Sequence, residues 1–277
     1  MMNPPLVSIV LPSFNAEGTI GEAISSILMQ TWENWELLLI DDGSKDRTVE
    51  IARSFNDSRI RIFVDGRNRG LPARLNEAID LASGKYFARM DNDDISFPER
   101  FSKQVEYLES HPEIDLLGTK ALTFVAPGAA TGIFPFKQTH EEICARPWNG
   151  FYLPHPTWMG KIEWFRKHRY RNVNRAEDQD LLLRSYPTSR FACLPEMLFA
   201  YRLRKKFSTE ISRASRKSLF RSQRIIFAER RQWDFLILAF LAYILKSSFD
   251  YFRPYLQHAG HVNSPEWERL KSELAGR

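Results

Sequence analysis

The feature that most constrains the fold is an alternation of two hydrophobic periods along roughly the first 110 residues. Four short apolar segments bounded by turn residues predict β-strands, at 6–11, 36–40, 59–64 and 85–90. Between them, helical spacing of apolar residues predicts helices at 20–28, 46–55 and 75–82, and a fourth at 99–110 that Pro112 ends. Strand and helix in regular order favour parallel pairing through right-handed crossovers, and therefore an α/β domain with a mostly parallel sheet.

The rest of the chain is less regular. Proline and glycine interrupt 123–201, which predicts a loop-rich half built against the first. Residues 202–231 hold eleven Lys and Arg against two Asp and Glu, so they carry a formal charge of +9, whereas the whole chain carries +5. An apolar run at 235–245 follows. We therefore divide the chain into three segments, 1–125, 126–203 and 204–277.

Composition excludes several classes of protein. With 277 residues, 43% of them hydrophobic and 26% charged, the chain is neither disordered, collagen-like nor a coiled coil. Cys144 and Cys193 are too few for a disulfide framework or a thiolate metal site, so we expect packing residues in a reducing compartment. The N-terminus lacks a basic and apolar secretory signal, which predicts a protein of the cytosol or of its membrane face.

Polar residues follow three of the predicted strands, in the segments 12–15, 41–44 and 91–94. In an open parallel sheet, ligands bind at the carboxyl ends of the strands. Two of these segments bring together five aspartates, which repel one another unless a cation offsets their charge: Asp41, Asp42, Asp91, Asp93 and Asp94. Oxygen ligands without thiolates predict Mg²⁺ or Mn²⁺ bridging to a diphosphate.

Each acidic motif also has an ordinary structural explanation. Asp-Gly-Ser is a common turn, and the aspartates at 91–94 could cap the following helix. Their position at one sheet edge favours a ligand site. A helix-loop-helix calcium site is disfavoured because no glycine stands at the sixth position from Asp91, and the glycine fingerprints of phosphate-binding loops are absent. The sequence therefore predicts that a cation holds the phosphate.

The motifs together resemble family-2 glycosyltransferases of the GT-A fold. The resemblance covers roughly residues 6–110 and rests on Val7–Asn15, Leu39–Ser44, Asn68–Gly70, Arg74–Asn76 and Met90–Asp94, with a weaker match at Glu177–Leu181. It implies a nucleotide-diphosphate sugar donor, a uridine one by family habit, a divalent cation and inversion at the anomeric carbon. Residues 1–125 would then bind the donor and 126–203 the acceptor, and the match fades beyond residue 203.

The resemblance also implies roles for individual residues. Pro12 and Phe14 would line the base pocket, with Asn15 and Glu17 at the nucleotide edge. Of the pair Asp41 and Asp42, the second would accept a hydrogen bond from the base. Arg74 would lie near the donor phosphates or sugar, although an arginine on a helix is more often solvated. Asp91 would face the ribose or donor sugar, and Asp93 would be the metal ligand.

Inverting transfer also needs a carboxylate that takes the proton of the acceptor hydroxyl. Asp178 fits the family position for this base, and the leucines 181–183 predict an apolar helical face just after it. The alternative is that Glu177, Asp178 and Asp180 are first-turn charges favoured by the helix dipole. His155 could reach the acceptor or the phosphates, as could Glu177, or it could be an ordinary loop residue.

Two other classes of function compete with this hypothesis. A sugar-phosphate nucleotidyltransferase also uses an acidic metal site, but we would expect a glycine-rich, basic loop in place of residues 12–17. A non-catalytic protein could use the basic stretch to bind nucleic acid or a membrane. The stretch holds few aromatic residues that could stack on bases and leads into an apolar run, so we expect a membrane partner and no nucleic acid.

The apolar run is too short to cross a bilayer. Eleven helical residues span about 16 Å, roughly half the hydrocarbon core, and extending the run to Phe252 would enclose Lys246 and Asp250. It is therefore either a buried core helix or a segment in the membrane interface. Aromatic residues at its far end, Tyr243, Phe249, Tyr251, Phe252 and Tyr255, favour the interface. We expect a monotopic enzyme on the cytoplasmic face of the membrane, acting on a lipid-linked saccharide for a surface polysaccharide.

Overall fold

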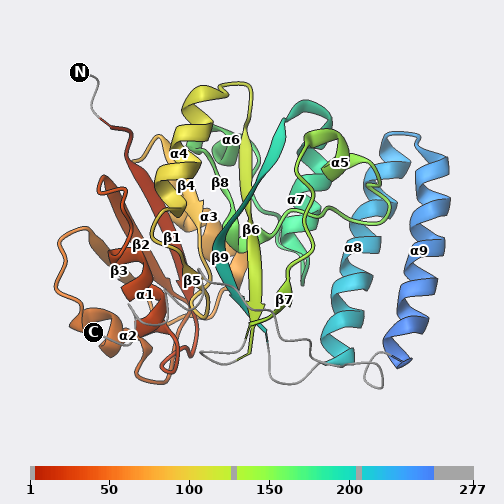
Figure 1. Ribbon diagram of the computed structural model, residues 1–277. Helices are drawn as coiled ribbons and strands as arrows, with labels where there is room; N and C mark the ends of the chain where they lie inside the picture. Colours follow the sequence, from red (N-terminus) through yellow and green to blue (C-terminus); the bar gives the residue numbers. More distant parts are fainter. Residues whose placement is uncertain (1–3, 126–129, 204–207, 253–277) are drawn as a thin grey trace.

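The computed structural model describes residues 4–125, 130–203 and 208–252. Within these ranges nine strands form one mixed sheet in the order β3-β2-β1-β4-β8-β6-β9-β5, with β7 paired to β6. Helices cover both faces of the sheet (Figure 1). The strands are β1 (Val7–Ser13), β2 (Trp35–Asp41), β3 (Ile60–Val64), β4 (Tyr86–Arg89), β5 (Ile95–Ser96), β6 (Leu116–Phe124), β7 (Ala130–Ile133), β8 (Met159–Lys161) and β9 (Phe191–Arg202). The α-helices are α1 (Ile20–Leu28), α2 (Thr48–Ser54), α3 (Leu71–Leu81), α4 (Arg100–Ser110), α5 (His140–Cys144), α6 (Ile162–Lys167), α7 (Glu177–Ser185), α8 (Thr209–Glu229) and α9 (Trp233–Phe252), and 3₁₀ turns lie at His155–Thr157 and Tyr186–Thr188.

The first half confirms the predicted alternation of strands and helices. Strand β1 pairs in parallel with β2 on one side and with β4 on the other, and β2 pairs in parallel with β3. Every residue of β1 is buried, which explains why it reads as a continuous apolar run. Helix α3 begins at Leu71, four residues before the predicted start at Leu75. Gly70, at φ +82°, turns the chain just before this helix.

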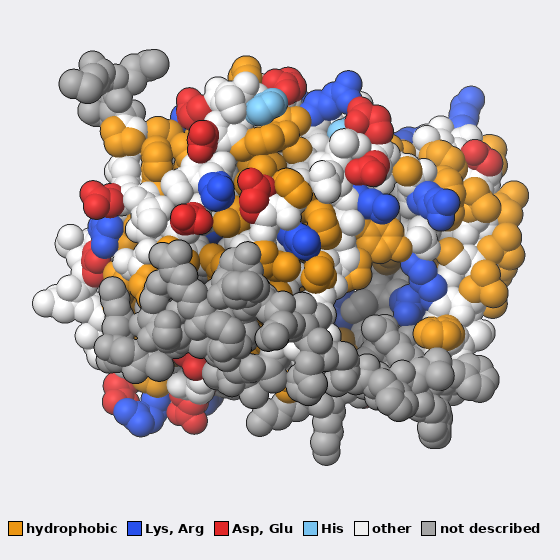
Figure 2. All heavy atoms as spheres, in the orientation of Figure 1, with side chains coloured by type: hydrophobic (Ala, Val, Ile, Leu, Met, Phe, Trp, Pro, Cys, Tyr) orange, Lys and Arg blue, Asp and Glu red, His pale blue; other side chains and the backbone are white. Residues whose placement is uncertain are grey.

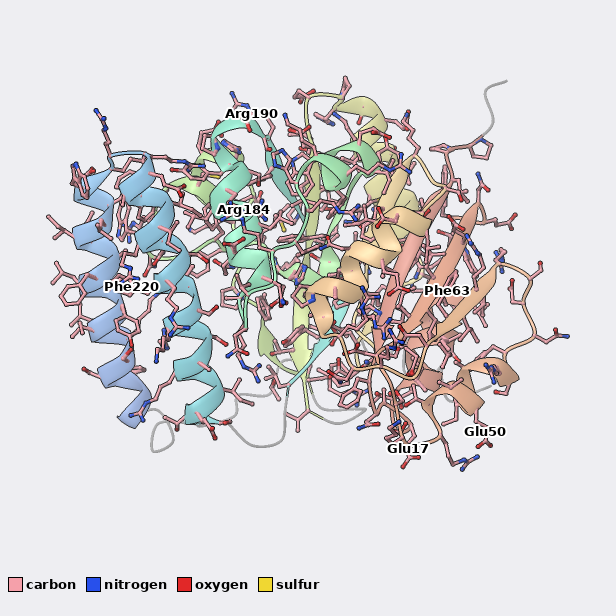
Figure 3. All side chains as sticks on the ribbon, turned by 180° about the vertical axis from the view of Figure 1, so that it is seen from behind. Glu17, Glu50, Phe63, Arg184, Arg190 and Phe220 are labelled. Atoms are coloured by element: carbon pink, nitrogen blue, oxygen red, sulfur yellow. The ribbon has the colours of Figure 1, made fainter. Side chains whose placement is uncertain are left out.

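Alternate side chains of the central strands build two cores on opposite faces of the sheet. On one face Ile9 and Leu39 pack with Ile24 of α1 and Phe101 of α4. On the other face Val10 and Leu38 pack with side chains of α3, α6, α7 and α8, among them Leu75, Phe165, Leu182 and Phe227. Figure 3 shows this second face, with α3 and α7 in front of the sheet. Cys193 is buried in this core and both cysteines are free thiols, as expected of packing residues.

The second half is more regular than the sequence indicates. Strands β6 and β9 pair in parallel over most of their length, and β8 lies antiparallel between β4 and β6. The sheet is therefore mixed beyond β4. The described residues between 123 and 201 supply strands β7 and β8, most of β9 and helices α5, α6 and α7, so this part of the chain is less dominated by loops than predicted. Register shifts between Thr119 and Ala121 and Pro195 inside β9 interrupt the alternation that would have revealed these strands.

Helices α8 and α9 form a hairpin at one end of the molecule (Figure 1). Phe220 of α8, labelled in Figure 3, stacks on Tyr243 of α9 at 5.0 Å between ring centroids. The opposite side of α9 is exposed, with Ile237 at 62% and Leu245 at 70%, so α9 packs on one side only. A location in the membrane interface stays a prediction. In the part of the chain that the structure describes, no helix has both the length and the apolarity needed to span a bilayer. Residues 204–207 and 253–277, which include Tyr255, lie outside the described residues. The division of the chain into segments after residues 125 and 203 stays a prediction.

Candidate active site

The loops that follow β1 and β2 are bonded to each other at the carboxyl edge of the sheet. The amide of Asp42 donates to the Ser13 carbonyl at 2.8 Å. Asn15, at φ +48°, accepts from the Lys45 amide at 2.8 Å through its Oδ1 atom, and Glu17 accepts from the Arg47 amide at 3.1 Å. The side chains of Asn15 and Glu17 thus join the two loops. Pro12 is buried beneath them and Phe14 is 47% exposed at the edge.

Arg74 occupies the centre of a buried ionic network. Its guanidinium is 1% exposed and makes five hydrogen bonds, to the carboxylates of Asp42, Asp65 and Glu77 and to the Arg67 carbonyl. The bond from Arg74 Nε to Asp42 Oδ1 measures 2.8 Å. Burial lowers the pKa of Arg74, but hydrogen bonds led by that to Asp65 outweigh burial and leave the pKa raised. Arg74 is therefore no solvated helix side chain, and its place near the donor phosphates stays a prediction.

The pair Asp41 and Asp42 shapes the loops after β2 and β3. Asp42 accepts from the backbone amides of Arg69 and Gly70 as well as from Arg74. Asp41 Oδ2 accepts from the amides of Gly43 and Ser44, both at 3.0 Å. Its Oδ1 atom is buried, with no hydrogen-bond partner among the residues the structure describes. Gly43 has φ +82°, and a Cβ there would lie 3.0 Å from the Arg67 carbonyl carbon, so only glycine permits this close approach.

Asp91, Asp93 and Asp94 converge just after β4. Each offers one carboxylate oxygen to a group whose members all lie within 4.8 Å of one another. Burial and then the charge of Asp91 raise the pKa of Asp93 to about 6, and the same causes raise the pKa of Asp94 well above its usual range. Asp94 Oδ2 is buried and has no hydrogen-bond partner in the described ranges. The carboxylates therefore repel one another, and the role of Asp93 as a metal ligand stays a prediction.

A second acidic group forms at the start of α7. Glu177 and Asp178 begin this helix, and leucines 181–183 are fully buried after them, as the sequence predicts. His155 lies with them, its Nδ1 atom 3.9 Å from Glu177 Oε1 and its Nε2 atom 2.9 Å from the Tyr170 hydroxyl. Burial, and then the charge of Asp178, raise the pKa of Glu177 to about 7, while burial also raises the pKa of Asp178. Burial lowers the pKa of His155 well below its usual range, so this imidazole is neutral.

Gln179 fixes the position of Asp178. Its amide nitrogen donates to Asp178 Oδ2 at 3.1 Å and to the Phe151 carbonyl, while its amide oxygen accepts from the Phe151 amide at 2.8 Å. This clamp connects the start of α7 to the segment before His155. Gly150, at φ +99°, brings the backbone close to Gln179.

Arg89 lies next to both acidic groups. It is 2% exposed, and its Nη2 atom is 2.7 Å from Asp91 Oδ1. Burial lowers the pKa of Arg89, but the charge of Asp91, the hydrogen bond to Asp91 and the charge of Glu177 outweigh burial and raise this pKa. Its Nε and Nη1 atoms are buried, with no hydrogen-bond partner in the described part of the chain.

Sequence reasoning missed Arg89 and two further residues of the site. Tyr170 is placed by Asn76, whose side chain bonds both the amide and the carbonyl of Tyr170. Arg202 donates to Asp94 Oδ1 at 2.7 Å from its backbone and to the Asp93 carbonyl at 2.6 Å from its side chain. A charged residue inside an apolar strand, two positions before Asp91, was the available signal for Arg89. For Tyr170 and Arg202 we find no comparable signal.

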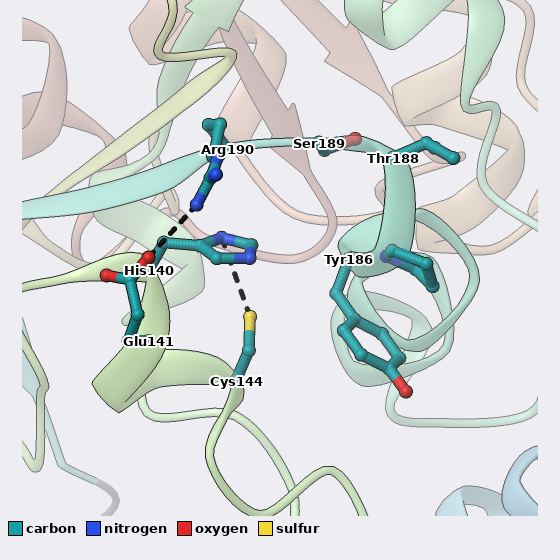
Figure 4. Close-up of a pocket in the computed structure, with 8 residues that line it drawn as sticks. His140, Glu141, Cys144, Tyr186, Thr188, Ser189 and Arg190 are labelled. Atoms are coloured by element: carbon teal, nitrogen blue, oxygen red, sulfur yellow. Dashed lines mark hydrogen bonds and ion pairs between the residues drawn. The ribbon is translucent and has the colours of Figure 1, made fainter.

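A shallow pocket of about 580 Å³ lies elsewhere, between α5 and the segment that leads into β9 (Figure 4). It contains a thiol next to an imidazole, with Cys144 Sγ 3.7 Å from His140 Nδ1. That nitrogen also accepts from the Phe191 amide, and burial raises the pKa of Cys144 to about 12. The thiol is therefore protonated at neutral pH and is no activated nucleophile.

Comparison with known proteins identifies the chain as a glycosyltransferase. The chain belongs to glycosyl transferase family 2, because the model of that family matches residues 8–169. A putative glycosyltransferase of Bacillus subtilis, EpsE, is 37% identical over 193 residues, which are 67% of this chain and 68% of EpsE. An Escherichia coli protein named as a UDP-Glc:α-D-GlcNAc-diphosphoundecaprenol β-1,3-glucosyltransferase is 42% identical over 107 residues, 39% of this chain and 42% of that protein.

Solved structures show the same fold. S. aureus TarS 1–349 in complex with UDP-GlcNAc superposes with a TM-score of 0.70 over 97% of this chain and 80% of that one, at 18% identity. The match to the longer TarS chain covers only 39% of it. A mannosyltransferase of Pyrobaculum calidifontis in complex with GDP-Man and Mn²⁺ superposes with a TM-score of 0.62 over 99% of this chain and 80% of that one, at 16% identity. Family membership decides against the nucleotidyltransferase and non-catalytic alternatives, and the GT-A fold is confirmed.

Proposed function

We propose that this chain is a metal-dependent inverting glycosyltransferase that moves a sugar from a UDP-sugar to a saccharide acceptor. The observation that carries the proposal is that two acidic groups, Asp91–Asp94 and Glu177–Asp178, both interact with buried Arg89, the first through an ion pair and the second through its charge. The first suits a cation-bridged diphosphate and the second suits a proton acceptor. The TarS complex with UDP-GlcNAc supports a uridine donor.

The carboxylates after β4 fit a divalent cation. Their oxygens lie within 4.8 Å of one another, no thiolate is among them, and Asp94 keeps a buried oxygen without a partner among the described residues. Asp93 would hold Mn²⁺ or Mg²⁺, with Asp91 and Asp94 beside it. When bound, such a cation neutralises the diphosphate and stabilises it as a leaving group. The mannosyltransferase complex with Mn²⁺ supports this assignment.

Asp178 would act as the general base. The acceptor hydroxyl oxygen forms a bond to the anomeric carbon while the bond from that carbon to the diphosphate oxygen breaks, and the hydroxyl proton passes to the Asp178 carboxylate. Burial makes Asp178 a stronger base than a solvated aspartate, since it raises the pKa of the carboxyl. The Gln179 clamp holds the Oδ2 atom of this carboxylate. Glu177 and His155 would contact the acceptor or the phosphates.

The loops after β1 and β2 would bind the nucleoside. Pro12 and Phe14 would contact the base, Asp42 would accept a hydrogen bond from it, and Asp41 has a buried oxygen that no described residue bonds. Asn15, Glu17 and Arg74 hold these loops in place through the bonds described above. Asp91 would face the ribose or the donor sugar.

The acceptor we propose is a saccharide linked to a lipid, used at the cytoplasmic face of the membrane to build a surface polysaccharide. The name of the Escherichia coli relative, with its diphosphoundecaprenol acceptor, supports this choice. That similarity covers 39% of this chain.

The proposal is tested by calorimetry and by a hydrolysis screen with the full chain. UDP should bind in the presence of Mn²⁺ and lose most of its affinity in a chelator, and GDP should bind more weakly. A screen of nucleotide sugars should then show hydrolysis of a UDP-sugar that depends on the metal. Equal UDP affinity with and without chelator would refute the metal assignment, and preference for another base would refute the uridine donor.

A further inference from the structure

The α8–α9 hairpin carries an apolar face that packs against nothing else in the described residues. Its large side chains recur at helical spacing along α9 and are all at least 46% exposed: Trp233, Ile237, Phe240, Leu241, Ile244, Leu245 and Phe249. From Trp233 to Phe249 this face is about 24 Å long at 1.5 Å per residue. A soluble monomer rarely exposes a continuous apolar surface of this length, so a partner is expected.

No exposed charge interrupts this face between Phe235 and Phe249. The one ionic side chain in that interval, Lys246, turns inward and donates to the Asn149 carbonyl at 2.7 Å. Burial accordingly lowers the pKa of Lys246. The charge that would oppose burial of the helix in lipid is therefore held against the protein.

Exposed cations lie on the adjacent helix. Lys217, Arg221 and Arg224 are spaced by four and three residues, so they form a stripe along one side of α8, and Arg231 is exposed in the turn to α9. Figure 2 shows Lys and Arg side chains over α8 beside hydrophobic side chains over α9 on the same face of the molecule. Apolar side chains flanked by cations match the acyl and headgroup layers of an anionic membrane.

We propose that the α8–α9 hairpin lies flat in an anionic lipid surface, with the outer side of α9 inserted among the acyl chains and the α8 stripe at the headgroups. This deepens the proposed function, on which it rests for the membrane-borne acceptor. A second copy of the chain would bring identical cations to the edge of the interface, whereas anionic headgroups neutralise them. The charge pattern therefore favours lipid over self-association.

The hairpin is also bonded to the elements that hold the proposed base. Arg230 donates to the carbonyls of Leu183 and Arg184 at the end of α7, whose first residues are Glu177 and Asp178. Gln223 of α8 donates to the Pro147 carbonyl, and Lys246 of α9 bonds Asn149, close to the Gln179 clamp. Docking of the hairpin would therefore fix the orientation of the acceptor side of the site relative to the lipid surface.

Flotation of the full chain with lipid vesicles tests the proposal. The protein should float with phosphatidylglycerol-containing vesicles, less with pure phosphatidylcholine, and less at high salt because the headgroup attraction is screened. Ile244→Asp should lower the partition coefficient at least tenfold, since it places a charge on the inserted face. The matched control is Ile133→Asp on β7, because both isoleucines are 46% exposed, and it should float like the unmodified chain.

The cationic stripe has its own test. Replacing Lys217, Arg221 and Arg224 by glutamine should lower partition onto anionic vesicles about 100-fold, from about fivefold for each positive charge removed near the surface. The control makes the same change in net charge at exposed cations of other elements, Arg53, Lys137 and Lys167, and should have a small effect. Circular dichroism and melting temperature confirm that each variant is folded.

Three outcomes would overturn the proposal. The unmodified chain could fail to float with anionic vesicles, both isoleucine variants could float equally, or Ile244→Asp could change the mass of the protein in light scattering without changing flotation. The last result would mean that the apolar face of α9 binds a second copy of the chain and not lipid. UDP binding by the unmodified chain is measured separately, so loss of the glycosyltransferase function and loss of membrane docking give different results.

Discussion

Three arginines, Arg74, Arg89 and Arg100, are each at most 2% exposed and organise the polar edge of the sheet. Arg74 and Arg89 bond carboxylates, and Arg100 donates to the Arg89 carbonyl at 2.8 Å. Burial lowers the pKa of Arg100 to about 9. A charge is buried only where partners converge on it, and those partners come from distant parts of the chain. The sequence therefore identified the carboxylates at the strand ends and Arg74, but neither Arg89 nor Arg100 and none of the contacts that these arginines make.

We predict that Asp93→Asn and Asp178→Asn separate donor binding from proton transfer. Asp93→Asn should abolish transfer and the effect of Mn²⁺ on UDP affinity without lowering the melting temperature, because it removes a charge from a repelling cluster. Asp178→Asn should lower turnover about 10²- to 10⁴-fold and keep UDP affinity. Calorimetry and steady-state rates check both. If UDP affinity falls equally in the two variants, Asp178 belongs to the donor site.

Glu177 should make the metal-free protein less stable as pH rises. Its pKa is raised to about 7 in the folded chain, whereas the unfolded value lies near 4.5, so the folded state holds the extra proton between these pH values. Unfolding releases that proton, and the free energy of unfolding falls as pH increases from about 4.5 to 7. Glu177→Gln should remove roughly 2 kcal/mol of this fall, measured by urea unfolding in chelator from pH 5 to 8. Parallel curves for the two proteins would contradict the shifted pKa.

At the scale of elements, the hydrophobic periodicity within each segment explains which strands and helices could be predicted from the sequence. Strands β1 to β4 with α1 to α4 follow one hydrophobic pattern each, and their parallel pairing follows from the alternation of strand and helix, whereas the pairing of β4 with β1 instead of β3 does not. Strand β8 has only three residues and β9 contains Pro195 and a register shift against β6. Such strands are specified by contacts with the completed sheet, so no local pattern reveals them.

The approach of β4 to β1 depends on a glycine. A Cβ at Gly84 would lie 2.5 Å from the Leu6 carbonyl oxygen and 2.8 Å from the Ser8 amide, both backbone atoms that cannot move aside alone. Gly84→Ala should therefore destabilise the fold by about 1–3 kcal/mol, measured by urea unfolding. Gly18→Ala is the control, since nothing lies within 4 Å of its added Cβ. Equal stability of the two variants would show that the strand ends shift freely.

At the scale of the whole molecule, the sheet separates two cores that differ in their dependence on the C-terminal hairpin. The core with α1 and α4 contains no residue from α8 or α9, whereas the opposite core includes Ile226, Phe227 and Ala239. Phe235 of α9 also packs against Trp148 and Phe227. The apolar run at 235–245 could not reveal this from sequence, because its inner and outer sides are equally hydrophobic. Only the packing on α8 distinguishes the buried side from the exposed one.

A chain ending at Gln232 should therefore lose stability on one face of the sheet. Without α9, Phe220, Phe227 and Trp148 lose the aromatic contacts that α9 provides, at a cost of roughly 2–4 kcal/mol. Native-state hydrogen exchange should show faster exchange in α7 and α8, and unchanged protection in α1 and β1, because segments open in separate cooperative units. A chain ending at Phe252 is the matched control for the residues beyond α9. Equal loss of protection on both faces would mean that the two cores unfold as one unit, and that α9 stabilises the donor side as well.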